Sequence, residues 1–300
     1  MKQQKHPNFI IIGAMKAATT SLYTYLKQHP DIFMSSVKEP MFFNNFNKEN
    51  NYVIKGRKTK KIASLKQYYN LFDSAKNETA IGEASPTYIS DKNCPILIKE
   101  HLPNIKIIAI LRQPVDRAYS NYLHAQRSGK EIIHDFEIAF NEEKVRIEKN
   151  WSPLYHYKSK GFYFEQLNRY YNLFPKENIH IVLFDEIIKD PETVSKKIFN
   201  FLNVDDSFIP DFSKKINVSG TPKGIFGWIV MKSRYFNLMP NIEFSKYLPQ
   251  AIIKFLFNSA YSKPKKITEK MVKKLTNLHY KDDILKLEKL IDKDLKHWLS

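Results

Sequence analysis

Cysteine, glycine and long apolar runs are all scarce in this sequence. Its 300 residues include one cysteine and eight glycines. The single Cys94 excludes an internal disulfide, and no cysteine or histidine pair has metal-ligand spacing, so we expect no metal site. No apolar run reaches the roughly 18 residues of a membrane-spanning helix, and no signal-peptide pattern is present. These absences predict a protein of a reducing, cytoplasmic compartment.

Acidic residues are too few to balance the basic ones. The chain has 48 lysines and arginines against 31 acidic residues, which gives a net charge of +17. This excess favours either an anionic partner or a solvated, lysine-rich surface. No nucleic-acid-binding motif accompanies it, so we expect no nucleic-acid partner. The basic run at residues 55–61 is either a solvated loop or a rim that attracts a sulfated or carboxylated acceptor.

Residues 225–260 mix aromatic side chains with lysines and allow two interpretations. They form packed helices, as a lid over an acceptor cleft would, or an amphipathic patch that contacts a membrane. Pro240 and Pro249 interrupt short apolar runs, which favours packed helices over peripheral membrane contact.

The most informative segment follows the apolar run Phe9–Ile12. That run predicts a strand, and the residues after it predict a tight loop and the start of a helix: Gly13, Lys16, Ala17, Ala18, Thr19, Thr20 and Ser21. Backbone N–H groups, the positive end of a helix dipole and a lysine ammonium together form a phosphate-binding site. The segment lacks the Gly-Lys-Ser/Thr ending of the nucleotide triphosphatase loop. On its own, it would equally suit a plain strand-to-helix turn.

A second segment repeats the order of strand, loop and helix. The apolar run Ile105–Leu111 predicts a strand that ends at Arg112, and Pro114 suits the first turn of the helix that follows. Ser120 lies farther along that helix. Arginine offers a two-pronged donor for phosphate, so Arg112 and Ser120 are candidates for a second phosphate site.

Together these segments resemble the sulfotransferases that use 3′-phosphoadenosine 5′-phosphosulfate (PAPS), in particular the heparan sulfate branch and its bacterial relatives. The pattern G-x-x-K-x-G-T-T-x-L matches from Gly13 to Leu22 except at Ala18, and L-R-x-P-x-x-R-x-x-S-x-Y matches throughout from Leu111 to Tyr122. The resemblance implies that the first loop binds the 5′-phosphosulfate, that Arg112 and Ser120 bind the 3′-phosphate, and that Lys223 belongs to a later cofactor-binding loop.

Three departures from the family pattern concern the loop and the acceptor side. Ala18 replaces a glycine or serine, so it either adopts a conformation that an L-residue tolerates or strains the loop. Ala84 stands where many relatives have lysine, and Met41 stands where the heparan enzymes often have histidine. The donor site is therefore expected to be intact, whereas the acceptor cannot be copied from those enzymes.

The resemblance also implies catalytic roles. Lys16 is expected to stabilise charge on the transferred group and the leaving oxygen, and Glu39 to act as the general base. The alternative for Glu39 is a structural ion pair with Lys38, and His124 is a rival base. Lys38 and Glu83 are assigned to the acceptor side; Glu83 could instead orient Lys16 or be merely structural.

Alternating strand and helix patterns predict an α/β fold, a P-loop-like three-layer arrangement with a central parallel sheet flanked by helices. Further strands are expected at Thr79–Ile81 and Ile179–Phe184, and another after the first helix. We expect one domain over residues 1–300, with a core at about 7–225 and a helical extension at about 226–300. Apolar spacing within Thr268–Trp298 predicts that this extension ends in a docked pair of helices.

These features predict a PAPS-dependent sulfotransferase that acts on a hydroxyl or amine of a carbohydrate-like acceptor, with adenosine 3′,5′-bisphosphate as the nucleotide product. One alternative is a nucleotide-dependent kinase with a divergent loop, since Asp185 and Glu186 follow a predicted strand. Another is a basic, non-catalytic module that binds polyanions. A Mg²⁺ requirement would indicate the kinase, and a lack of response to the bisphosphate would indicate the binding module.

Overall fold

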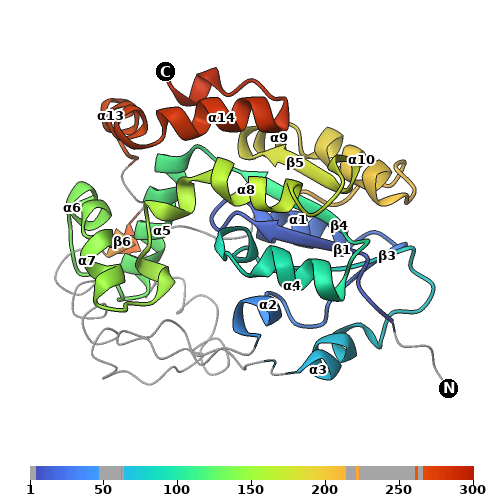
Figure 1. Ribbon diagram of the computed structural model, residues 1–300. Coiled ribbons are helices and arrows are strands. Elements are labelled where there is room, and N and C mark those ends of the chain that lie inside the picture. The colour runs from blue at the N-terminus through green and yellow to red at the C-terminus, as the bar shows by residue number, and fades with distance from the viewer. Residues whose placement is uncertain (1–4, 47–61, 63, 214–220, 223–260, 263–265) are drawn as a thin grey trace.

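A five-stranded parallel sheet lies at the centre of the molecule (Figure 1). The computed structural model describes residues 5–46, 62, 64–213, 221–222, 261–262 and 266–300. Within them the strand order is β2-β3-β1-β4-β5. The strands are β1 (Phe9–Gly13), β2 (Ile32–Met34), β3 (Ala80–Ala84), β4 (Lys106–Leu111) and β5 (Ile179–Leu183). The predicted parallel α/β fold is confirmed, and so is the strand expected after the first helix.

The central strands are apolar because helices cover both faces of the sheet. All five residues of β1 are buried, as are five of the six in β4. Gly82 of β3 is required by packing, since a Cβ at this position would lie 2.5 Å from the Phe9 ring. Strand β1 therefore sits between β3 and β4 at close contact, and the loops that follow all three strands meet at one edge.

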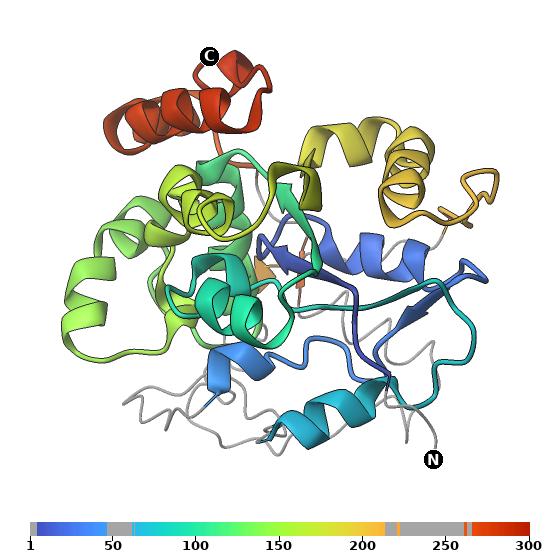
Figure 2. The ribbon, with the colours of Figure 1, turned by 45° about the vertical axis from the view of Figure 1, so that its right-hand side comes forward.

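Helices flank this sheet on both sides. Helices α1 and α10 contact one another on one face, and α4 and α8 both contact the short turn at Tyr88–Ser90 on the other (Figure 2). The helices before the C-terminal pair are α1 (Thr19–Leu26), α2 (Phe42–Asn45), α3 (Leu65–Tyr69), α4 (Cys94–His101), α5 (Pro114–Arg127), α6 (Phe136–Asn141), α7 (Glu143–Glu148), α8 (Tyr163–Tyr171), α9 (Phe184–Lys189) and α10 (Pro191–Leu202).

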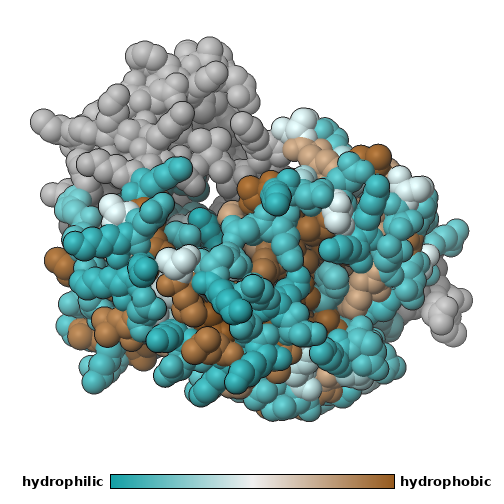
Figure 3. Space-filling view, turned by 90° about the horizontal axis from the view of Figure 1, so that it is seen from above, coloured by the Kyte–Doolittle hydropathy of each residue, from teal (hydrophilic) through white to brown (hydrophobic). Residues whose placement is uncertain are grey.

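The C-terminal helices α13 (Glu269–His279) and α14 (Lys281–Ile291) confirm the predicted helix pair. Helix α14 packs on α8 and α13 packs on α5. The Asp283 carboxylate accepts a hydrogen bond from the Phe164 amide at 3.1 Å, which joins α14 to the start of α8. Seen from the side of α13 and α14, the surface is mostly hydrophilic, with apolar residues in separate groups (Figure 3).

Several predictions lie outside the described residues. These are Lys223, the basic run 55–61 and the segment 225–260. Two short strands nearby are described, β6 (Thr221–Pro222) and β7 (Tyr261–Ser262), which pair antiparallel. Among the helices of the described ranges, none combines the length and the apolar character needed to cross a bilayer.

Candidate active site

The two predicted phosphate-binding loops are joined at the carboxyl ends of β1 and β4. The Ala14 amide donates to the Ile110 carbonyl at 2.7 Å, which extends the pairing of the two strands. The Arg112 guanidinium then donates to the Lys16 carbonyl at 3.2 Å and lies 4.5 Å from the centre of the Phe184 ring. One arginine thus braces the loop that carries the lysine. Parallel topology brings such loops to one edge of the sheet. The second phosphate site expected at Arg112 and Ser120 stays a prediction.

The first loop adopts left-handed backbone at two non-glycine residues. Lys16 has φ 73°, and Ala18, the residue that precedes α1, has φ 64° and ψ 16°. An L-residue in this region costs about 1–2 kcal/mol. Of the two alternatives for Ala18, the strained loop is the one observed. At Gly13 the constraint is close packing, because a Cβ there would lie 2.4 Å from a methyl group of Ile89.

Helix α1 begins directly after this loop and presents its first amides without a side-chain cap. Ala18 supplies no capping oxygen, and the first turn contains no acidic residue. Thr19, Thr20 and Ser21 occupy that turn. Uncapped N–H groups and the helix dipole make such a terminus favourable for an anion. The predicted hydroxyl residues are therefore brought to the same end of the sheet as Lys16 and Arg112.

Positive charges gather around Lys16. Burial, together with the charges of Arg127 and Arg112, lowers the pKa of its ammonium to about 8, while the charge of Glu39 acts in the opposite direction. Burial also lowers the pKa of the Arg112 guanidinium, with Asp116 opposing that shift. Like charges held together in a partly buried site favour a bound anion, because an anion relieves their mutual repulsion.

Glu39 and Lys38 face the start of α1 from the segment after β2. The Lys38 ammonium donates to the Thr20 hydroxyl at 2.8 Å and lies 3.4 Å from a Glu39 carboxylate oxygen. Both side chains are partly exposed, at 39% and 32%. The ion pair considered as an alternative for Glu39 is thus present. It is accessible to solvent, however, and the Lys38 ammonium links the Glu39 carboxylate to Thr20 in the first turn of α1. The Glu39 charge also raises the pKa of Lys16.

Glu83 is buried completely beneath this site. Its carboxyl accepts hydrogen bonds from the Ser85 hydroxyl at 2.7 Å and the Tyr68 hydroxyl at 3.4 Å. Burial raises its pKa to about 7, partly offset by the hydroxyls of Ser85, Tyr88 and Tyr68. Its direct contacts are therefore with hydroxyl groups of the protein, and its role toward an acceptor stays a prediction.

Helix α5 brings a further cation that sequence reasoning missed. Ser120, His124 and Arg127 follow one another at intervals of four and three residues, so they share a face of the helix. Arg127 lies within 3.4 Å of a His124 ring nitrogen and is close enough to Lys16 to lower its pKa. The spacing from Ser120 is the signal that could have identified Arg127. Strand β6 also contacts α5.

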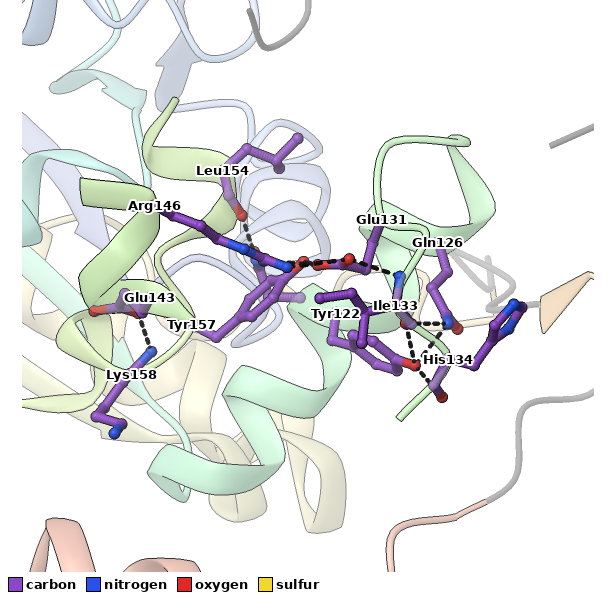
Figure 4. A network of polar contacts seen from close by, with 11 residues as sticks. Tyr122, Gln126, Glu131, Ile133, His134, Glu143, Arg146, Leu154, Tyr157 and Lys158 are labelled. Carbon is purple, nitrogen blue, oxygen red and sulfur yellow. Dashed lines mark hydrogen bonds and ion pairs between the residues drawn. The ribbon is translucent and has the colours of Figure 1, made fainter. Parts of the chain in front are cut away.

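Two residues of the second motif support α5 rather than face the site. Arg117 is fully buried and donates to the Tyr157 carbonyl. The Tyr122 hydroxyl donates to the His134 carbonyl at 2.6 Å, as Figure 4 shows. Beside them, Arg146 binds both oxygens of Glu131 at 2.7 and 3.2 Å, and the Tyr157 hydroxyl donates to the same carboxylate at 2.8 Å. This network fixes the helix that carries Ser120.

Metal chemistry has no visible basis in the part of the chain that the structure describes. No group of three His, Cys, Asp or Glu side chains there could hold a metal ion. Cys94 is buried. The groups at the site that can bind an anion or accept a proton are its lysine, its arginines, the amides and hydroxyls at the start of α1, and one accessible carboxylate.

Comparison with known proteins identifies the family. A family model described as "Sulfotransferase domain" matches residues 6–218. The chain belongs to the sulfotransferase family. Its fold agrees with the crystal structure of a sulfotransferase from Alicyclobacillus acidocaldarius, with a TM-score of 0.76 and 29% identity, covering 99% of this chain and 100% of that one.

Curated relatives include sulfotransferases of several kinds. The membrane-associated sulfotransferase kil1 of Dictyostelium discoideum is 27% identical over 293 residues, covering 72% of this chain and 60% of that protein. Heparan sulfate glucosamine 3-O-sulfotransferase 5 of Mus musculus is 30% identical over 204 residues, covering 67% of this chain and 54% of that protein. This sulfotransferase spans between 22% and 60% of the length of the first relatives it matches.

Proposed function

We propose that this sulfotransferase moves the sulfuryl group of PAPS to a hydroxyl or amine of a carbohydrate acceptor. One observation carries the proposal: Arg112 holds the loop of Lys16 at the carboxyl ends of β1 and β4, and Glu39 contacts the Lys38 ammonium that bonds to Thr20 at the uncapped start of α1. This arrangement combines an anion-binding site with an accessible base, which is what sulfuryl transfer requires.

The donor is proposed to lie across both loops. The 5′-phosphosulfate fits against the amides and hydroxyls from Gly13 to Ser21, where α1 has neither a side-chain cap nor an acidic residue in its first turn. Arg112 and Ser120 would hold the 3′-phosphate, and Lys223 is proposed to complete that side. Two separate phosphate sites suit a nucleoside bisphosphate better than a nucleoside monophosphate.

The transfer step needs little covalent participation by the protein. As a bond forms between the acceptor oxygen or nitrogen and sulfur, the bond between sulfur and the bridging phosphate oxygen breaks. Glu39 takes the proton of the acceptor, and the Lys16 ammonium stabilises the charge that develops on the leaving phosphate oxygen. Lys16 is charged for this purpose at neutral pH because its pKa lies at about 8.

The carbohydrate acceptor is supported by the names of relatives. These include heparan sulfate glucosamine 3-O-sulfotransferase 5 and carbohydrate sulfotransferase 15. Lys38 lies beside Glu39 with its ammonium partly exposed, so we propose that it binds an anionic group of the acceptor. Incubating the protein with labelled PAPS and a panel of unsulfated glycans, amino sugars and phenols would test the acceptor class.

Nucleotide binding tests the donor assignment. We expect adenosine 3′,5′-bisphosphate to bind more tightly than ATP or AMP in calorimetry, without Mg²⁺, because only the bisphosphate fills both phosphate sites. Lys16→Ala and Arg112→Ala should weaken this binding. No preference for the bisphosphate over ATP would refute the proposal, and a Mg²⁺ requirement would favour phosphoryl transfer instead.

The base assignment has its own test. Glu39→Gln should lower turnover at least about a hundredfold, to a measurable residual rate, and leave bisphosphate affinity unchanged, because the side chain keeps its size and loses its ability to accept a proton. His124→Gln serves as the comparison. Loss of turnover in the His124 variant together with retained turnover in the Glu39 variant would transfer the base role to His124.

A further inference from the structure

We infer that Ser85, oriented by the buried carboxyl of Glu83, is a positioning residue that holds the turn carrying Glu39. This inference rests on the base role proposed for Glu39. The Ser85 hydroxyl lies between two partners: it accepts from the Met41 amide at 2.9 Å and donates to a Glu83 oxygen at 2.7 Å. Ser85 and Glu83 are both fully buried, so water does not compete for these bonds.

The direction of each hydrogen bond follows from valence. A serine hydroxyl has one proton, and an amide can only donate. With the Met41 N–H on one oxygen lone pair of Ser85, the hydroxyl donates its proton to the ionised Glu83 carboxylate, which can only accept. The carboxyl of Glu83 thereby fixes the rotation of the hydroxyl and keeps a lone pair aimed at the turn. A neutral residue without an acceptor oxygen at position 83 would leave that rotation undefined.

A second hydroxyl repeats the arrangement two residues farther along the chain, inside α2. The Tyr88 hydroxyl accepts from the Phe43 amide at 3.3 Å and also interacts with the Glu83 carboxyl, lowering its pKa. Helix α2 begins without a side-chain cap from Met41, so its first amides need partners from elsewhere. Ser85 and Tyr88 supply them, and Glu83 links the two.

The turn needs such support because its backbone is strained. Glu39 has φ 57° and Met41 has φ 50°, both in the left-handed region, with Pro40 between them. Residues in this region persist only where surrounding contacts enforce them. The Lys38 ammonium holds the turn to Thr20 on one side, and Ser85 holds it to β3 on the other. Glu39 lies between these two attachments, so its carboxylate is fixed relative to the donor loop.

Amide hydrogen exchange tests the contact without relying on activity. In Ser85→Ala, the Met41 amide should exchange about tenfold faster, as expected from losing one buried hydrogen bond. The matched control is Ser90→Ala, because the Ser90 hydroxyl bonds to the Thr87 carbonyl in the same short turn and should leave Met41 exchange unchanged. Tyr88→Phe should accelerate exchange at Phe43, which provides a second variant if Ser85→Ala does not fold.

Turnover distinguishes a positioning role from a merely structural one. It is followed as bisphosphate release from PAPS in the presence of the unsulfated heparan backbone. Ser85→Ala should lower kcat at least tenfold while bisphosphate affinity stays within twofold of the wild type. Added to Glu39→Gln, the same substitution should cause no further loss, because Ser85 acts through Glu39.

Two results would overturn the inference. One is an unchanged exchange rate of the Met41 amide in Ser85→Ala. The other is a loss of kcat from Ser85→Ala that is equal in the wild type and in the Glu39→Gln variant. Full turnover of Glu39→Gln alone would refute the base assignment. In that case the exchange data would still show whether Ser85 holds the turn, so the two failures are distinguishable.

Discussion

Replacement of Lys16 by methionine should stabilise the free protein while weakening donor binding. The ammonium is charged at pH 7, although burial and three nearby arginines lower its pKa from 10.5 to about 8. That shift of about 2.5 units corresponds to about 3 kcal/mol, because one unit of pKa is worth about 1.4 kcal/mol. Methionine keeps the length of the stem and removes the charge, so Lys16→Met should regain about 2–3 kcal/mol of folding free energy at pH 7.

The dependence on pH has a definite sign. Between pH 8 and 10.5 the folded protein binds fewer protons at Lys16 than the unfolded chain does, so wild-type stability from this group rises with pH in that window. The advantage of Lys16→Met should therefore be full at pH 7 and small near pH 10. Lys27→Met is the matched control, since Lys27 is exposed just after α1 and its replacement should change stability by less than about 0.5 kcal/mol.

Chemical denaturation at pH 7 and at pH 10 measures both effects, and calorimetry with adenosine 3′,5′-bisphosphate measures the loss of binding. We expect the variant to bind the nucleotide at least about tenfold more weakly, because an anion no longer meets the ammonium. A variant that is less stable than the wild type at pH 7 would contradict the reasoning. So would a stability difference that stays the same at both pH values.

The remaining predictions concern stability and are read from unfolding free energies. Ala18→Gly should stabilise the folded protein by about 0.5–1 kcal/mol, because the strain relieved at φ 64° exceeds the entropy that glycine adds to the unfolded chain. The control Ala17→Gly, at a buried position, should destabilise it. Burial raises the pKa of Glu83 to about 7, so between pH 4.5 and 7 the folded protein binds more protons at this group than the unfolded chain does. The free energy of unfolding of the wild type should therefore fall by about 3 kcal/mol as pH rises through this window. Glu83→Gln should remove this decline. Arg146→Ala should cost about 3–5 kcal/mol by leaving a buried carboxylate without its partner, whereas Lys196→Ala, which breaks an exposed ion pair, should cost far less.

The sheet and the meeting of its loops could be predicted from the sequence for a physical reason. Buried parallel strands are continuous apolar runs, and the runs at Phe9–Ile12 and Ile105–Leu111 are too short and too apolar for surface helices. Once two such strands are parallel and adjacent, the residues after them must share one edge. The same topology accounts for the contact of Arg112 with the Lys16 carbonyl, which the sequence patterns alone did not predict.

The support of the site could not be predicted in the same way. The bond from Ser85 to Met41 depends on the path of the chain between β2 and β3, which no periodic pattern encodes. The effect of Arg127 on Lys16 depends on how α5 crosses the end of the sheet. Glu83 follows a glycine in an apolar strand, and only the structure shows that its partners are hydroxyl groups rather than a lysine.

Backbone strain in this molecule is concentrated where side chains are needed. Of the seven non-glycine residues with positive φ in the described part of the chain, Lys16, Ala18, Glu39 and Met41 belong to the donor loop and the turn facing it. Glycine would relieve about 1–2 kcal/mol at each position. Glycine at position 16 or 39 would also delete the ammonium or the carboxylate, so relieving the backbone strain at these positions would remove a group that the proposed chemistry uses. At 18 and 41 the side chain has no such role, and glycine there should preserve turnover. If Lys16 and Glu39 have the proposed roles, strain at 16 and 39 accompanies side chains that transfer needs, and we expect that it can be removed at 18 and 41 without loss of turnover.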